Sequence, residues 1–235
     1  MATVLTIIGI LLTIFLSAPA INLCIRKYSN FRERRRWSAD LLVEKALVPK
    51  LDHYAFDSWD QKINVDHVGS AVHVVNARMM NISPDLISHL YFTVYCDGTD
   101  IPGEAVRPWA KLGRKNLHTK LEDWDYKKAR GRINILIAPP VQPGKRIRIR
   151  WGYTLPNTFG PGNEYYNWDI ATLHYEISGR IIFSQPWKIL YARWDDDLIH
   201  SQDVPKIDGS IITWKVHFPD KGQRIMMKIG LDKTA

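Results

Sequence analysis

The sequence predicts an all-β soluble domain, an antiparallel β-sandwich or a barrel-like relative of it, joined to one N-terminal transmembrane α-helix. Three observations predict this class. The chain begins with a long uncharged apolar run, it then shows a series of short segments with two-residue periodicity, and Pro and Gly turns separate those segments. No long helical pattern lies between the strands, which favours a sandwich or barrel over an α/β fold. We expect a transmembrane helix in 1–25, a basic juxtamembrane collar with a short helix in 26–49, and a cytoplasmic β-sandwich domain in 50–235.

The predicted membrane helix rests on the segment from Ala2 to Ile25, which contains no charged side chain. A helix of this length reaches roughly 36 Å, enough to cross a hydrocarbon core of about 30 Å. Lys and Arg favour the cytoplasmic side of a membrane, so the basic residues after the run place the C-terminal domain inside. These collar residues, which we expect on anionic lipid headgroups, are Arg26, Lys27, Arg32, Arg34, Arg35 and Arg36.

Two alternatives compete for this N-terminal run. Ala18-Pro19-Ala20 has the small-residue pattern of a signal-peptide cleavage site, which would remove the run after Ala20. The missing n-region cations, the continuation of the run to Ile25 and the basic collar all favour a retained span. A buried core helix is disfavoured, because such a helix seldom has an apolar surface all the way round.

Composition agrees with a membrane-associated protein in a reducing compartment. The chain carries 32 Lys and Arg against 24 Asp and Glu, with a net charge of +8, and the collar accounts for much of the excess. The two cysteines, Cys24 and Cys96, are too few for a disulfide framework or a CxxC metal site. After the collar, the spacing of Trp37, Leu41 and Leu42 predicts a short juxtamembrane helix that ends at Pro49.

Strands are expected from residue 51 onward, at about 62–67, 71–76, 90–96, 133–138, 145–153, 171–177, 180–184, 187–194, 210–218 and 224–231. The clearest reads KRIRIRWGY and begins at Lys145. Its apolar residues point one way, while Arg146, Arg148 and Arg150 point the other. Arginines about 7 Å apart can follow the phosphates of a ligand or a patch of lipid headgroups. The alternative is an exposed sheet face whose arginines pair with neighbouring acids.

A second candidate binding segment is the Gly- and Pro-rich connection from Phe159 to Asp169. Its aromatic side chains either cap the sandwich core or bind a partner. In the second case Tyr165, Tyr166 and Trp168 offer stacking platforms. With Arg148 or Arg150 nearby to supply anion contacts, this combination would suit a nucleotide or a single-stranded nucleic acid.

Motifs for catalysis are missing from the sequence. It contains no GxSxG, GxGxxG, Walker loop or HExxH. His67 and His73 flank a turn, but strand histidines are more often hydrogen-bonded partners than metal ligands. The one carboxylate cluster, Asp195 to Asp197 with His200 nearby, reads best as a solvated loop, since three consecutive acids cannot all face one ion in an extended chain. We therefore expect no catalytic residue, no metal and no cofactor.

These observations favour a non-enzymatic, single-pass membrane protein. Its cytoplasmic β-domain is expected to bind a protein partner or an anionic ligand such as a nucleotide, and to act through homo-oligomerisation. One alternative is a ligand-gated effector that perturbs the membrane, for example in a bacterial antiviral defence system that responds to a nucleotide messenger. A second alternative is a metal-dependent hydrolase that uses Asp195, Asp197 and His200.

Overall fold

The computed structural model describes residues 53–95, 101–195, 204–217, 219 and 224–233. The chain divides into two compact units, Met1–Pro49 and Lys50–Ala235, and the described residues all belong to the second. In the ranges just given, no helix is long and apolar enough to cross a bilayer. The predicted transmembrane helix in 1–25 and the basic collar in 26–49 lie outside these ranges and stay predictions.

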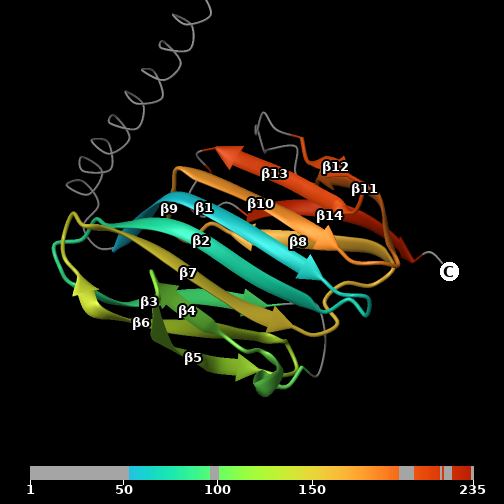
Figure 1. The fold of residues 1–235 in the computed structure, drawn as a ribbon. Coiled ribbons are helices and arrows are strands. Elements are labelled where there is room, and N and C mark those ends of the chain that lie inside the picture. Colours follow the sequence, from blue (N-terminus) through green and yellow to red (C-terminus); the bar gives the residue numbers. More distant parts are fainter. Residues whose placement is uncertain (1–52, 96–100, 196–203, 218, 220–223, 234–235) are drawn as a thin grey trace, which may run out of the picture. The chain divides into compact units, whose positions relative to one another are not determined.

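The second unit consists mainly of β-strands (Figure 1). Their bounds are β1 (Tyr54–Val65), β2 (Ala71–Asn81), β3 (Ile87–Tyr95), β4 (Trp109–Leu112), β5 (Lys115–Asp125), β6 (Arg130–Val141), β7 (Arg146–Leu155), β8 (Gly162–Asp169), β9 (Leu173–His174), β10 (Glu176–Phe183), β11 (Trp187–Trp194), β12 (Lys206–Asp208), β13 (Ile211–His217) and β14 (Arg224–Lys233). One short 3-10 helix, η1 (Gly103–Ala105), precedes β4.

The strands form two open sheets. The 11-stranded sheet has the order β12-β13-β10-β1-β2-β7-β4-β5-β6-β3, with β9 beside β1, and the 3-stranded sheet has the order β11-β14-β8. The predicted β-rich class is confirmed. The expectation of purely antiparallel pairing is wrong, because β1 runs parallel to both β9 and β10. Parallel neighbours need a long crossover, and here the chain passes through β2 to β8 before it returns to β1.

Two large clusters of apolar side chains and a small third one, made of Ile170, Ile177, Val216 and Ile225, form the core of the described residues. The first lies between strands of the large sheet, where β2 and β7 contribute Val75 and Ile149 and where β3 and β6 contribute Leu90 and Ile133. The second lies between the two sheets, where β1, β10 and β13 meet β11 and β14. Its buried members are Ile63, Val65, Ala71, Phe159, Ile181, Phe183, Trp187, Ile212, Trp214, Met227, Ile229 and Leu231.

Strand β7 shows the predicted alternation. Ile149 and Trp151 are buried, whereas Arg146, Arg148 and Arg150 are exposed. The sequence missed other strands. The segment read as a Gly- and Pro-rich connection contains β8, which pairs with β14 over its whole length. It was missed because its polar residues and glycine are typical of loops, and pairing with an apolar neighbour strand overrides that preference.

Close packing around Gly179 predicts that a larger side chain at this position lowers the stability of the domain. This residue lies opposite Trp214 in the β10–β13 pair, and a Cβ on Gly179 would overlap the Trp214 ring. We expect Gly179→Ala to lower the free energy of unfolding by about 1 to 3 kcal/mol, measured by urea unfolding. The control is Ser178→Ala on the outer face of the same strand, for which we expect a change within about 0.5 kcal/mol. Equal effects of the two variants would contradict this account.

Candidate functional site: an aromatic cavity beside β8

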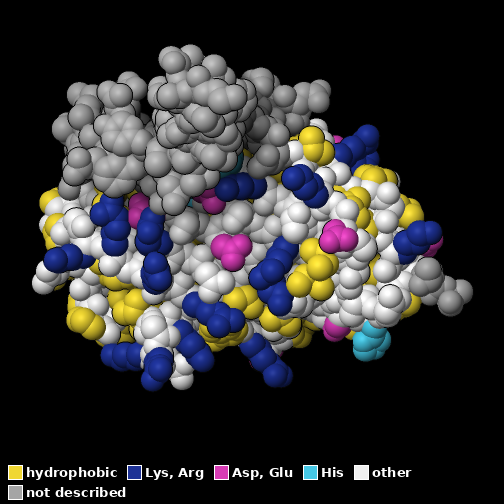
Figure 2. Space-filling view, turned by 45° about the horizontal axis from the view of Figure 1, so that its top comes forward, with side chains coloured by type: hydrophobic (Ala, Val, Ile, Leu, Met, Phe, Trp, Pro, Cys, Tyr) yellow, Lys and Arg dark blue, Asp and Glu magenta, His cyan; other side chains and the backbone are white. Residues whose placement is uncertain are grey.

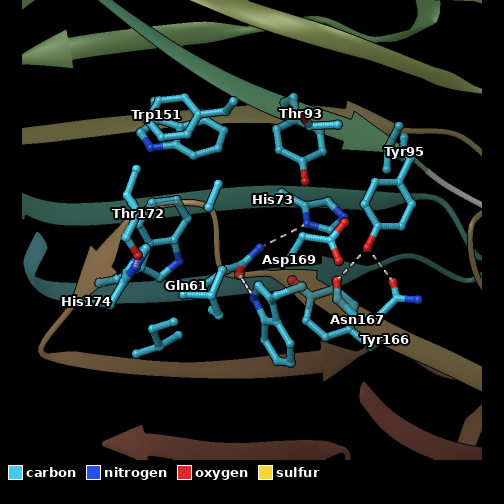
Figure 3. A pocket seen from close by; sticks show the side chains of 18 of the residues that line it. Gln61, His73, Thr93, Tyr95, Trp151, Tyr166, Asn167, Asp169, Thr172 and His174 are labelled. Carbon is cyan, nitrogen blue, oxygen red and sulfur yellow. Dashed lines mark hydrogen bonds between the residues drawn. The ribbon is translucent and has the colours of Figure 1, made fainter. Parts of the chain in front are cut away.

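A cavity of about 240 Å³ lies against the inner face of the central strands β1, β2 and β7, with β8 on its other side (Figure 3). Strand β7 contributes Trp151 and Tyr153 to the lining, while β1 contributes Trp59 and β2 contributes His73. All four are inward-facing members of strands whose side chains alternate between faces. The wall nearest the large sheet is therefore built mainly from aromatic rings.

The rings of this wall contact one another in a continuous series. Trp59 packs edge-on against Trp151 with 5.7 Å between ring centroids, and Trp151 stacks beside Tyr153 at 5.8 Å. Tyr153 in turn stacks on His73 at 4.6 Å with an interplanar angle of 9°. Such contacts add stability beyond the burial of apolar area. The wall is thus a packed, preformed surface.

A hydrogen-bonded series crosses the cavity from β8 to β2 and determines the tautomer of His73 (Figure 3). The Trp168 indole Nε1 donates to Gln61 Oε1 at 3.0 Å, and Gln61 Nε2 lies 3.3 Å from His73 Nδ1. An indole can only donate, so the Gln61 oxygen must face Trp168 and its amide nitrogen must donate to His73. His73 Nδ1 is consequently the acceptor, and Nε2 carries the proton.

Three N–H donors on this wall are buried, and no described residue accepts from them. They are the indole nitrogens of Trp59 and Trp151 and the Nε2 of His73. His73 and Trp151 are each only 3% exposed. A fourth such nitrogen belongs to Trp214, whose ring packs against Gly179 and does not line the cavity. A buried donor without an acceptor costs about 1 to 3 kcal/mol, so each of these three donors would gain from an acceptor atom placed in the cavity.

The cavity interior favours neutral groups. Burial lowers the pKa of His73 to about 3, so the imidazole is neutral at physiological pH. Burial also raises the pKa of Tyr166 well above its usual value, with Tyr153 and Tyr95 adding to the effect, so this phenol keeps its proton. Both shifts express the high cost of placing a charge here without a counter-charge.

Charged side chains line the cavity only where it meets solvent. Arg130, at the start of β6, and Asp169, at the end of β8, are both exposed lining residues. Asp169 accepts from Arg224 Nε at 2.7 Å. Glu164 accepts from the backbone N–H of Gly160 at 2.7 Å. Arg130 is therefore the cation of the lining that a ligand at the mouth would meet.

The structure separates the two groups of residues that the sequence proposed as one ligand site. Tyr165, Tyr166 and Trp168 all line the cavity. The arginines of β7 stand on the opposite face of the large sheet from Trp151, so the expected proximity of Arg148 or Arg150 to these rings is wrong. The physical reason is the two-residue period of β7 itself, which sends its rings inward and its arginines outward.

Tyr166 and Trp168 also behave partly as the core-capping alternative predicts. Both rings pack against Trp214, with centroid distances of 5.7 and 5.3 Å. Tyr165 points away from that contact, is 40% exposed, and has Lys228 Nζ 5.5 Å from its ring centroid. The segment therefore both closes the core and lines the cavity.

Sequence reasoning missed Trp59, Gln61 and Trp151 as site residues. Trp151 was read only as an apolar strand residue, and no motif marks the other two. His73 was identified only as a strand histidine that flanks a turn with His67, for which a hydrogen-bonded role was favoured over a metal-binding one. Its bond to Gln61 confirms that interpretation.

The proposed metal-binding cluster is mostly outside the described ranges. Asp195 is described, and its backbone N–H donates to the carbonyl of Met226 at 2.9 Å. Asp196, Asp197 and His200 lie outside the described residues. Among the residues that are described, no group of three or more His, Cys, Asp and Glu side chains is arranged to hold a metal ion.

Comparisons with known proteins yield distant similarities of fold. No protein-family model matches the sequence, and no curated protein sequence matches it. A candidate protease from Parabacteroides distasonis aligns with 75% of this chain and 40% of its own length, at 6% identity and a TM-score of 0.44. For an M1 zinc metallopeptidase from Deinococcus radiodurans the coverages are 75% and 42%, the identity 10% and the TM-score 0.45.

A candidate nutrient-binding protein from Legionella pneumophila aligns with 77% of this chain and 68% of its own, at 10% identity and a TM-score of 0.43. The chain spans about two fifths of the length of the candidate protease and of the metallopeptidase. Identities and TM-scores in this range assign neither a family nor an activity to the chain.

Protonation of His73 predicts a pH-dependent stability. The pKa of this side chain is about 3 in the folded state and 6.5 as its ordinary value. Between these two values the unfolded chain binds a proton that the native state does not, so stability is lost as the pH falls from about 6.5 towards 3. The slope for one proton reaches about 1.4 kcal/mol per pH unit.

We expect His73→Gln to remove this contribution, so that urea midpoints of the variant fall less steeply than those of the parent between pH 6.5 and pH 4. The matched control is His118→Gln at an exposed position of β5, which should follow the parent curve. A His73→Gln curve parallel to that of the parent would show that His73 is not buried in its neutral form.

Proposed function

We propose that this chain is a single-pass, membrane-anchored, non-enzymatic binding or sensing protein. Its β-domain takes a small neutral molecule into the aromatic cavity. The observation that carries this proposal is the set of three buried donors on one wall, at Trp59, His73 and Trp151. A ligand that accepts hydrogen bonds from them recovers the free energy that their burial costs.

The cavity defines the chemical class of the ligand. Stacked rings on the wall favour a ring system, and N–H donors favour carbonyl, ether or ring-nitrogen acceptors. Neutral His73 and protonated Tyr166 disfavour a charge on the buried part. A volume of about 240 Å³ lies below the usual range for drug-sized ligands, so the buried part contains one or two rings.

The alternative of an effector that responds to a nucleotide messenger is supported by one feature, Arg130 at the cavity mouth. A nucleotide would place its neutral base against the aromatic wall and its phosphates in solvent beside this guanidinium. In that case the ligand is anionic as a whole, although its buried part is neutral. Homo-oligomerisation would then bring the membrane segments of several copies together.

Membrane anchoring is supported by the sequence of the N-terminal region. The uncharged run from Ala2 to Ile25 is long enough to cross a bilayer, and the cations from Arg26 to Arg36 follow it at once. In a sensor of this type, ligand binding to the β-domain would be transmitted to the membrane segment. Binding of a protein partner to the same domain is a separate proposal.

Caffeine is a suitable first probe for the cavity, because it is neutral, has two fused rings and carries only acceptor atoms. We expect saturation-transfer NMR to detect its binding to the purified full chain. Replacing Trp151 by Phe removes one N–H donor and keeps an aromatic ring. We expect this variant to bind caffeine about three- to tenfold more weakly, the effect of one lost hydrogen bond.

The matched control is Trp214→Phe, which removes a buried indole N–H that does not line the cavity. Its affinity for caffeine should equal that of the parent. Equal weakening by both variants would assign the effect to general destabilisation, and a parent chain that shows no saturation transfer would contradict the proposed ligand class.

The proposed anchoring makes a prediction about topology. A reporter that is active only in the cytoplasm, fused after Ala235, should be active, because the collar residues keep the C-terminal domain inside. A matched fusion uses a reporter that is active only outside the cytoplasm, and it should be silent. The reverse pattern, or a mature chain that begins at Ile21, would overturn the orientation and the anchor.

A further inference from the structure

The outer face of the large sheet carries a second feature that the cavity does not use. Strands β10, β1, β2, β7 and β4 are consecutive neighbours, so their outward side chains form a surface about 19 Å wide. Figure 2 shows more Lys and Arg side chains than Asp and Glu side chains on the face that is in view. We call this surface the basic face; its cations are Lys62, Arg78, Lys111, Arg146, Arg148, Arg150 and Arg180.

Strand register places like charges directly opposite one another on the basic face. Arg148 of β7 is the partner of Arg78 on β2, and Arg150 of β7 is the partner of Lys111 on β4. Like charges at opposed positions of neighbouring strands destabilise a sheet. A third pair, Lys62 of β1 and Arg180 of β10, repeats the arrangement on the other side of β2.

Acidic side chains neutralise only part of this charge. Asp57 pairs with both Arg78 and Arg146, at 3.0 and 2.9 Å. The five remaining cations of the basic face, Lys62, Lys111, Arg148, Arg150 and Arg180, form no ion pair with any carboxylate of the described residues. Asp60 of β1 adds one more exposed carboxylate to this face, and the Arg150 guanidinium lies over the Trp109 ring. The cations still outnumber the acids, so an external polyanion would lower the remaining repulsion.

We propose that the basic face docks on an anionic phospholipid surface. Its cations stand on one sheet face, where they can meet many phosphates of a bilayer at once, and each such contact is weak by itself. Guanidinium groups dominate the set, and they bind phosphate in a bidentate manner. The sequence also places an uncharged segment and a basic collar in the same chain, which would hold the domain close to lipid.

Nucleic acid fits the basic face less well than lipid does. Single strands are usually held by aromatic platforms, and the ring of this face, Trp109, is half-buried and has the Arg150 guanidinium 5.6 Å from its centroid. Duplex recognition usually needs an element that enters a groove, whereas these cations lie within strands. Charge complementarity and geometry therefore both favour the headgroup plane.

Arginine footprinting of the full chain tests this proposal. The chain is placed in nanodiscs of phosphatidylcholine alone or with about 30 mol% phosphatidylserine. It is then treated with phenylglyoxal, and the modification rate of each arginine is read by mass spectrometry. We expect Arg148, Arg150 and Arg180 to react about fivefold more slowly in the anionic discs, and about 0.5 M salt to abolish the difference.

Two arginines away from the basic face serve as internal controls. Arg132 on β6 and Arg193 on β11 are exposed and should react at the same rate in both discs. The double variant Arg148→Gln and Arg150→Gln should reduce the protection of Arg180, whereas Arg193→Gln should leave it unchanged. This readout does not involve the cavity, so it is independent of the caffeine experiment.

Three results would overturn the proposal. The first is equal rates at Arg148, Arg150 and Arg180 in both discs. The second is equal protection of Arg193, which would indicate a non-specific charge effect. The third is protection of the basic face by a single-stranded oligothymidylate added to neutral discs, with none from phosphatidylserine, which would assign the face to nucleic acid.

Discussion

Alternation of side chains along the central strands is the constraint on which both candidate surfaces depend. In β2, in β7 and in β1 beyond its irregularity at Phe56–Ser58, successive side chains point to opposite faces, so one strand serves two surfaces. Strand β7 shows this most clearly, because Trp151 joins the cavity wall while Arg148 and Arg150 join the basic face. A shift of register by one residue would exchange the two sets and destroy both surfaces together.

Gln61 connects the cavity to the packing of the two sheets. Its amide joins Trp168, on β8 of the small sheet, to His73, on β2 of the large sheet. Trp168 and His73 Nδ1 occupy the oxygen and the nitrogen of this amide, so His73 Nε2–H is left available for a ligand. The arrangement resembles a core in its burial and a binding site in its unpaired donors, and this combination is typical of a preformed small-molecule pocket.

The inner and outer faces of the large sheet differ in the charges that they can carry. On the inner face, desolvation keeps His73 and Tyr166 neutral and makes hydrogen-bond acceptors the preferred partners. On the outer face, water screens the repulsion between Arg148 and Arg78, so the sheet tolerates like charges that it could not tolerate inside. Under our two proposals, the inner face would bind a neutral ligand and the outer face an anionic surface.

The sequence by itself determined the β-rich class, the period of the β7 strand and the exposure of its arginines, because these follow from local periodicity and from the cost of burying charge. It also predicted that Tyr166 and Trp168 either cap the core or bind a partner, since exposed aromatic rings in a Gly-rich segment are costly. It did not reveal β8 as a strand, the parallel pairing of β1 with β10, or the meeting of Gln61, His73 and Trp168. These depend on contacts between segments that are distant in the sequence: 55 residues separate Asp169 of β8 from Arg224 of β14, and 107 separate Gln61 from Trp168. Only the tertiary structure, through the packing of the small sheet against the large one, decides which of those segments meet.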